Sequence, residues 1–471
     1  MKPRIILLGI ILAAVLAVPA VSSQTSIILE STFGLFEDDV DNFLDPNDYG
    51  YVEFDNAFIF LKGSDRNARG LNTSPAGAAD WGNSGKVNSN TAGIQGGFGT
   101  WIKNLYLGLG FDTNLWDGEE TIVETDGDRA DPMNSFDNPT ERGIVFDGGF
   151  GLLFGTENIG ALKLSFDFDN FSFNNDIRDG GSPEEFSYSD GNIDIGLGWG
   201  KNFELAGGLL SPELNVGYRI SNFKKEQTNP DGFSYIDYPG SDISNNPEQV
   251  FDRMSHLWVN PSTEFLSSTE AHWFAVSYTL DIGIHPQTIR KDPNTDREYD
   301  WDGYRVGNFL SAGYVRSVDV SDQFALAFGG NLDLGLITSK ADFTDLPDPI
   351  EYVDFSVNPD IEIGVTYDFV RPVQLYSALM LSSIDENFYT LSYGNDFSSE
   401  TETYTHTFVP WGLSAGLGLK FTPFPNFILD LGLSQNLSYY VSDKLEYVWA
   451  WDLFNWDDHP FTIALQATIK F

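Results

Sequence analysis

The sequence predicts an all-β protein, a closed antiparallel transmembrane β-barrel of about 16 strands, with about 14 as the alternative count. Three observations predict this fold class: apolar and polar residues alternate over long segments, short and long connections alternate along the chain, and the last strand ends in an aromatic residue. The 471 residues include 15% aromatic residues, no cysteine, and 69 acidic against 26 basic residues, for a formal net charge of −43. These values exclude a disordered chain, a disulfide-rich scaffold, a thiol metal site and a nucleic-acid-binding protein.

The amino-terminal residues have the pattern of a signal peptide. Lys2 and Arg4 precede an apolar run, Ile5 to Val18, and small residues follow it. The run is shorter than the ~20 residues that span a bilayer, so a retained membrane anchor is the less favoured alternative. The chain therefore divides into three parts: residues 1–23 as the signal peptide, 24–50 as a periplasmic segment and candidate plug, and 51–471 as the barrel.

Alternation with a period of two is clearest in four segments. Apolar residues share one face and mostly Gly, Ser, Asn or Asp occupy the other in 162–169, 324–336, 355–369 and 427–434. Strands of about 10 to 15 residues exceed the ~5–6 usual in soluble sheets and are long enough for the ~9–11 that cross a bilayer. A soluble sandwich would show a face rich in Lys, Thr and Glu to water, whereas a small acidic face is typical of a lumen.

Short connections alternate with long polar ones along the chain. The short ones fall at 103–104, 157–158, 201–211, 267–271, 320–322, 370–372 and 422–426. The long ones fall at 63–89, 117–142, 174–189, 224–252, 285–304, 340–351, 386–402 and 442–458. Short periplasmic turns and long outer loops produce this pattern. The weakest assignments are the first strand, near Tyr51 to Lys62, and the pair flanking Pro261; without two of them the count is about 14.

The carboxy-terminal strand has the form of an assembly signal. The segment Phe461 to Phe471 alternates up to a terminal aromatic residue, with Ile469 and Phe471 on the apolar face. Behind a signal peptide, such a strand resembles the targeting signal of Gram-negative outer-membrane β-barrels, which the barrel-assembly machinery reads. The resemblance implies localisation in the bacterial outer membrane, surrounded by its lipid bilayer. The acidic, Phe-rich composition and the stretch Asp39 to Phe43 also resemble those of spirochaete-type outer-membrane proteins.

The polar face of the strands predicts the lining of the lumen. It is acidic with few bases, and the candidate lining residues are Asp112, Asp167, Asp169, Asp194, Asp281, Asp333, Asp360, Glu362, Asp430, Lys163, Arg219 and Lys420. An acidic lining concentrates cations and repels anions. We therefore expect a porin-like channel for passive diffusion of small hydrophilic solutes, favouring cations or neutral solutes. Glycines on the same face leave room for an inserted segment, so an open and a plugged lumen are both compatible with the sequence.

Two further functions stay open at this point. The chain also resembles, more distantly, long-chain fatty-acid transporters of the FadL type, which implies a plugged lumen, an apolar pocket near the outer loops, hydrophobic compounds as cargo and about 14 strands. The other alternative is a surface-exposed structural or adhesive barrel whose loops bind a partner. Because 16-stranded porins are often trimers, a homotrimer is a further expectation.

Loops, histidines and tryptophans give weaker signals. Carboxylates that could bind Ca²⁺ cluster without EF-hand spacing at Asp126, Asp128 and Asp131, and at Asp292, Asp296, Asp300 and Asp302. Solvated acidic loops explain these clusters equally well, so no other cofactor is expected. The five histidines are scattered outside any catalytic motif, which predicts that the chain is not an enzyme. Tryptophans near strand ends, among them Trp101, Trp258 and Trp273, predict interfacial girdles, with a ligand-stacking surface as the rarer alternative.

Overall fold

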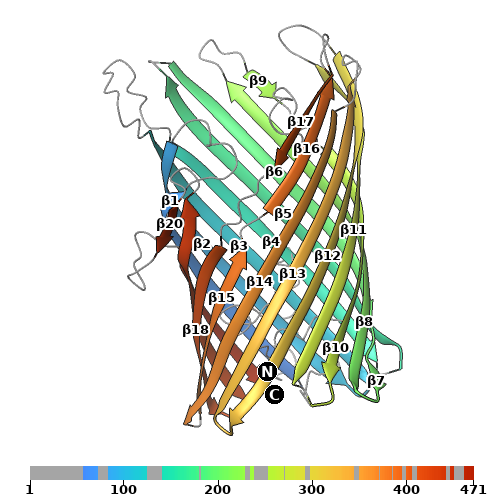
Figure 1. Cartoon of the computed structure of the whole chain (residues 1–471), viewed down its shortest axis with the longest axis vertical. Coiled ribbons are helices and arrows are strands. Elements are labelled where there is room, and N and C mark those ends of the chain that lie inside the picture. The colour runs from blue at the N-terminus through green and yellow to red at the C-terminus, as the bar shows by residue number, and fades with distance from the viewer. Residues whose placement is uncertain are drawn as a thin grey trace, which may run out of the picture.

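The computed structural model of the chain is a single β-sheet rolled into a tall cylinder of strongly tilted strands (Figure 1). It describes Leu35 and residues 57–72, 83–124, 140–156, 158–179, 182–228, 234–237, 253–269, 271–291, 298–343, 350–370, 372–383, 386–394, 399–405, 411–441, 446–449 and 461–470. Towards the outer ends of many strands only the backbone belongs to this description. The described residues contain no helix that is long and apolar enough to cross a membrane.

Sixteen strands form the wall within the described chain, which confirms the predicted count. They are β1 (Ala57–Asn72), β2 (Asn83–Ile102), β3 (Leu105–Glu124), β4 (Thr140–Thr156), β5 (Gly160–Asp179), β6 (Ser182–Gly200), β8 (Gly208–Thr228), β10 (Arg253–Ser267), β11 (His272–Lys291), β12 (Glu298–Ser321), β13 (Phe324–Phe343), β14 (Ile350–Val370), β15 (Val373–Ser383), β18 (Trp411–Phe424), β19 (Phe427–Val441) and β21 (Phe461–Lys470). Short segments extend their ends: β7 (Phe203–Leu205), β9 (Ser234–Asp237), β16 (Glu386–Gly394), β17 (Ser399–Thr405) and β20 (Glu446–Trp449).

The sheet closes because its first strand pairs with its last. β1 is antiparallel to both β2 and β21, and Phe60 lies opposite Gly97 on one side and Thr468 on the other. A closed sheet has no edge with unpaired N–H and C=O groups. The hydrocarbon core of a bilayer requires this, because it offers no hydrogen-bond partner to an exposed backbone.

Apolar side chains cover the outside of the cylinder and polar ones point inward. In β6, Ile195 and Leu197 are 47% and 58% exposed, whereas the adjacent Asp194 is 9% exposed. The same alternation holds in β19, where Leu431 is 43% exposed and Asp430 is fully buried. In water an apolar belt of this kind would cost about 25 cal/mol per Å². In a bilayer it contacts hydrocarbon, so the chain is a multi-pass β-barrel of the bacterial outer membrane.

The short connections lie at one end of the barrel, and the strand ends that flank the long connections lie at the other, as predicted. Lys103 adopts a left-handed φ of 60° in the tight turn between β2 and β3. The strands themselves are longer than expected, and β12 reaches 24 residues. The prediction of a loop over 174–189 is wrong, because β5 and β6 continue through it to Asp179 and from Ser182. The segment has few apolar residues and no alternation, yet its backbone continues the hydrogen-bonded ladder.

Pro261 lies inside a single strand. It belongs to β10 and pairs in register with Leu214 of β8. Towards β11 the pairing stops after Val259 and resumes at Ser262 without a shift in register. Proline has no N–H to donate, so the ladder is interrupted there while the strand direction is kept. β1 starts at Ala57, and residues 51–56 of the predicted first strand lie outside the described residues.

Candidate functional site

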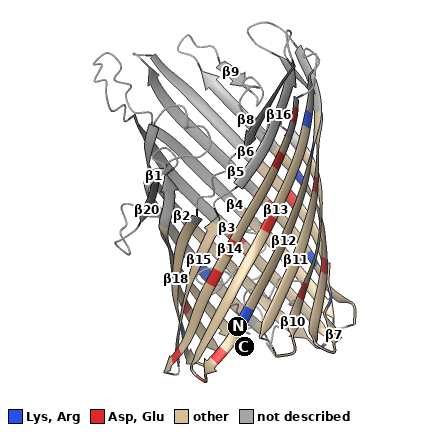
Figure 2. Ribbon diagram, viewed as in Figure 1, with Lys and Arg blue, Asp and Glu red and all other residues tan. Residues whose placement is uncertain are grey.

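Strand register aligns inward-facing polar side chains into a continuous path. Directly paired residues follow one another across neighbouring strands: Lys420, Asp430, Gln466, Lys62, Gln95, Asp112, Gly149, Asp167, Asp194, Arg219 and His256. We call this path the polar belt. Strands tilt in a closed barrel, so a path perpendicular to them climbs along its axis. Asp430 lies near the periplasmic start of β19, whereas Arg219 lies well beyond the start of β8. Acidic and fewer basic positions recur along the described strands in Figure 2.

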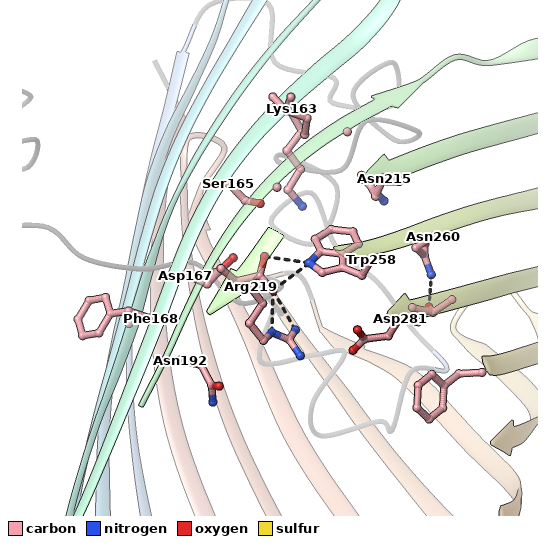
Figure 3. A pocket seen from close by; sticks show the side chains of 17 residues that line it. Lys163, Ser165, Asp167, Phe168, Asn192, Asn215, Arg219, Trp258, Asn260 and Asp281 are labelled. Atoms are coloured by element: carbon pink, nitrogen blue, oxygen red, sulfur yellow. Dashed lines mark hydrogen bonds and ion pairs between the residues drawn. The ribbon is translucent and has the colours of Figure 1, made fainter. Parts of the chain in front are cut away.

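The upper part of the polar belt borders a cavity of about 750 Å³ inside the barrel, which we call the belt cavity. Its wall comes from strands β4 to β6, β8 and β10 to β12 (Figure 3). Most of the lining side chains are polar: Lys163, Ser165, Asp167, Asn192, Asp194, Asn215, Arg219, Asn260, Thr279 and Asp281, together with the aromatic rings of Phe168, Trp258 and Phe309. The cavity therefore offers hydrogen-bonding groups beside three aromatic rings.

Asp194 is the centre of a bonded triad that spans three strands. Arg219 on β8 donates to its Oδ2 through Nε at 2.9 Å, and the terminal guanidinium nitrogen is 2.9 Å from the same oxygen. The indole Nε1 of Trp258 on β10 donates to Oδ1 at 2.9 Å and to Oδ2 at 3.0 Å. The carboxylate side chain is 12% exposed and the arginine 41%, so the charge of Asp194 is neutralised where it is buried.

The indole of Trp258 lies flat against the wall because the neighbouring strands carry glycine. A Cβ built on Gly217, its register partner, would lie 2.2 Å from the indole carbons Cε2 and Cζ2. On the next strand, a Cβ at Gly196 would lie 3.4 Å from Cζ2. Only residues without a side chain let the ring cross β8 and reach Asp194 on β6. The indole thus packs against the wall at these glycines, and the ring also lines the belt cavity.

Two further pairs hold the wall of the belt cavity on β10 and β11. His256 Nδ1 lies 2.9 Å from Asp281 Oδ1, and within the described residues this is the hydrogen bond that the ring makes. Asn260 donates through Nδ2 to Thr279 Oγ1 at 2.6 Å. Because His256 bonds to a carboxylate and no described hydroxyl group bonds to it, the pair lacks the nucleophile of a catalytic triad. We interpret both contacts as positioning the wall.

Part of the lumen near the periplasmic end is filled. Phe60, Tyr106, Leu153 and Tyr376 come from four wall strands and are at most 1% exposed. The belt members in this region are covered as well: Lys62 is 2% exposed, and Gln466 and Asp430 are fully buried. A water-filled channel would leave inward-facing side chains accessible, so the lumen is closed to water at these positions.

Leu35, which precedes the barrel in sequence, lies on the inner face of the wall. It is 5% exposed and packs with Ala327 of β13, Ala378 of β15 and Val315 of β12. A Cβ at Gly329 would come within 2.7 Å of its Cδ2 atom, so glycine makes the space that Leu35 occupies. Leu35 belongs to residues 24–50, the candidate plug; the rest of that segment lies outside the described residues.

A second cavity of about 440 Å³ lies beside Val315, the residue that contacts Leu35. Trp273 and Glu264 line it and are joined by a hydrogen bond from the indole Nε1 to the carboxylate at 3.3 Å. Across the cavity, Asp360 accepts a hydrogen bond from the backbone N–H of Asn331 at 2.8 Å, next to Glu362. The acidic groups here are thus partly satisfied by the wall itself.

The candidate lining residues of the sequence lie in wall strands on the inward face. The structure brings six of them into the polar belt: Asp112, Asp167, Asp194, Arg219, Asp430 and Lys420. It places Lys163 and Asp281 at the belt cavity, Asp360 and Glu362 at the second cavity, and Asp333 within 2.9 Å of Asn331 Nδ2. Asp169 pairs with Asp147 in β4, but its side chain lies outside the description. Whether these residues line an open pore stays a prediction.

Sequence reasoning missed Lys62, Gln95 and Gln466, although each stands on the polar face of its strand. It also assigned the wrong environment to several tryptophans. Trp258 and Trp273 line interior cavities, and Trp101 packs in a tilted arrangement against the buried ring of Tyr106, with the ring centroids 5.2 Å apart. The prediction of an interfacial girdle is wrong for these residues, because their strand positions alternate inward. The rarer alternative, a stacking surface, fits Trp258.

Other predicted residues fall partly outside the described part of the chain. Phe471 lies outside it, and Ile469 faces outward on β21 at 41% exposure. Among the candidate calcium ligands, Asp300 and Asp302 belong to β12 and their side chains are not described; the other five, Asp126, Asp128, Asp131, Asp292 and Asp296, lie outside. The described residues contain no group of three or more acidic or histidine side chains arranged to hold a metal ion.

Comparison with known proteins finds similarity in structure alone. No protein-family model and no curated sequence matches the chain. The toluene transporter TodX of Pseudomonas putida has a TM-score of 0.40 at 11% identity, over 96% of this chain and 100% of TodX. TbuX, a toluene transporter of Ralstonia pickettii, has 0.40 at 10%, over 95% and 99%. The monoaromatic hydrocarbon channel CymD has 0.36 at 10%, over 95% and 98%. Similarities of this size do not assign a family or a substrate to this chain.

Proposed function

We propose that the chain is a plugged outer-membrane transport channel for small organic compounds and not an open porin. The plugged lumen is that of the FadL-like alternative, whose expected cargo is hydrophobic compounds. The observation that carries this proposal is Leu35, a residue from before the barrel that is buried against the inner wall. An open 16-stranded barrel leaves an aqueous channel. Here several inward side chains near the periplasmic end are at most 2% exposed, among them Lys62 and Tyr106.

A plugged barrel needs a different transport mechanism from a diffusion pore. Solutes must first occupy a site above the obstruction and then pass when the obstruction moves. The belt cavity supplies a candidate for such a site, because it lies inside the barrel next to the filled region: its lining residue Lys163 pairs directly with the buried Leu153. TodX, TbuX and CymD are named for toluene and monoaromatic hydrocarbons, so toluene is one of the cargoes to be tested.

Removal of the candidate plug tests the proposal in planar lipid bilayers. With residues 24–50 deleted, we expect stable channels whose conductance exceeds that of the intact barrel by about an order of magnitude, since a 16-stranded wall then encloses water. A matched control replaces the same residues by a Gly/Ser segment of equal length, which keeps chain length but not Leu35. Heat-modifiable migration on gels checks that both variants fold. An intact barrel that already conducts as a large steady pore would contradict the plug and favour the diffusion porin.

A further inference from the structure

We propose that the belt cavity binds a small neutral ring compound carrying hydroxyl groups, with Trp258 as the surface on which the ring stacks. This inference rests on the proposed transport function and adds the chemical class of the cargo. Pyranose sugars and phenols share the required chemistry, namely a flat ring face together with hydroxyl groups. The proposal follows from the fixed indole, the bonding capacity around it and the balance of charge.

The indole is held in place by the protein itself. Its N–H donates to Asp194 at 2.9 and 3.0 Å, and Arg219 holds that carboxylate at 2.9 Å. Gly217 lies against the indole, where any Cβ would clash with it. The indole lines the cavity beside Asp194 and Arg219 (Figure 3). Rings stack on such a surface in an offset arrangement. A surface that is already ordered loses little entropy when a ligand binds, which favours affinity.

Polar groups beside the indole have unused bonding capacity. The carbonyl oxygen of Asn260 accepts no hydrogen bond from another described residue, while its amide donates to Thr279. The ammonium group of Lys163 donates no hydrogen bond to another described residue. An apolar ligand would displace water from these groups and leave them without partners, which weakens binding. A hydroxyl group both donates and accepts, so it satisfies either group.

The charges at the cavity largely compensate one another. Asp194 forms an ion pair with Arg219, and Asp281 forms a hydrogen bond with His256, so at most one carboxylate charge lacks a basic partner at the cavity. Lys163 and Asp167 stand on the same inward face of β5, one on each side of Ser165, with opposite charge. Charged solutes therefore meet no large uncompensated charge that would repay their desolvation. A neutral ligand with hydroxyl groups loses less hydration and fits this environment better.

Ligand binding to the purified, detergent-solubilised full barrel tests the proposal. Saturation-transfer NMR is recorded with methyl glucoside, phenol, toluene and the open-chain polyol sorbitol, with empty micelles as the reference. We expect saturable binding of methyl glucoside or phenol through ring protons, and weaker binding of toluene and sorbitol. Comparison of the affinities for methyl glucoside and phenol shows whether the cavity prefers a sugar or a phenol.

Variants assign the binding to Trp258. Trp258→Leu is expected to lower affinity about tenfold, the upper range for an aromatic contact, and Trp258→Phe less than about threefold, since it keeps a flat face. Gly217→Ala should act like Trp258→Leu, because its Cβ would displace the indole. Gly313→Ala is the matched control, since its Cβ meets its nearest atom, on Trp273, at an ordinary 3.4 Å.

Three results would overturn the inference. The first is that toluene or sorbitol binds as tightly as the hydroxylated rings, and the second is that no probe binds. The third is that binding is unchanged in Trp258→Leu and Gly217→Ala. The plug experiment is unaffected by any of these results, so the two proposals can fail separately.

Discussion

Leu197→Arg is expected to destabilise the barrel by about 1–2 kcal/mol in a bilayer. A lipid-facing arginine costs about 2–4 kcal/mol at mid-depth and less towards the interface, and Leu197 lies near the periplasmic end of β6. Leu197 is 58% exposed on the outside of β6, with apolar neighbours on both adjacent strands, Leu164 and Val216. In hydrocarbon the guanidinium group has neither water nor a counter-ion. The measurement is denaturant unfolding of the barrel reconstituted in lipid vesicles, followed by gel mobility and tryptophan fluorescence.

The matched control places the same charge on the same strand with the opposite orientation. Asn192 lines the belt cavity from β6, so Asn192→Arg adds a guanidinium group to a polar interior. We expect a change in unfolding free energy below about 1 kcal/mol, as for substitutions away from the hydrocarbon. Equal effects of the two variants would show that the apolar face does not contact lipid, and the membrane-spanning barrel would then be wrong.

A disulfide between Leu35→Cys and Ala378→Cys is expected to stop most transport. The wild-type chain has no cysteine, so the introduced pair has no competitor. Leu35 and Ala378 pack in one buried cluster, and the bond would tie the segment to the wall. A disulfide stabilises the tied state by about 2–4 kcal/mol, so uptake of methyl glucoside or toluene into vesicles should fall about tenfold or more. Reduction should restore uptake in the same sample.

A second pair controls for the cysteines themselves. Ser165→Cys lies on β5, across the barrel from the strands that contact Leu35, so its combination with Leu35→Cys should form no bond. Uptake by this pair should be the same under oxidising and reducing conditions. If the variant with cysteines at 35 and 378 formed its disulfide and still transported as fast as the same variant after reduction, the segment would not need to move. If no disulfide formed, the placement of Leu35 would be wrong.

Local sequence was a reliable guide to the face on which a side chain lies. Asp430 was expected to point inward because Leu429 and Leu431 flank it, and it does. The same rule misled where alternation was weak. The segment 174–189 has few apolar residues and was assigned to a loop, yet it continues two strands through backbone pairing alone. Trp258 was placed in a girdle because it was taken to lie near a strand end, whereas it lies inside β10.

The sequence did not predict which residues of different strands come into contact. Asp194 and Trp258 are separated by 64 positions, and their bond depends on the register of β6, β8 and β10. Gly217 gives no sign in the sequence that an indole crosses it. A shift of one residue in any of these pairings would turn one partner to the lipid. The contact between these residues therefore depends on several strand pairings at once, and no single segment of the sequence determines them.

The amino-acid order alone established a sealed, lipid-facing cylinder and the orientation of most of its side chains, because orientation repeats with every second residue along each strand. The folded molecule alone decided which inward groups meet, how the indole of Trp258 is held, and that Leu35 occupies the interior. Those features depend on contacts between residues far apart in the chain, and a period of two contains no information about which strands become neighbours or what enters the space between them.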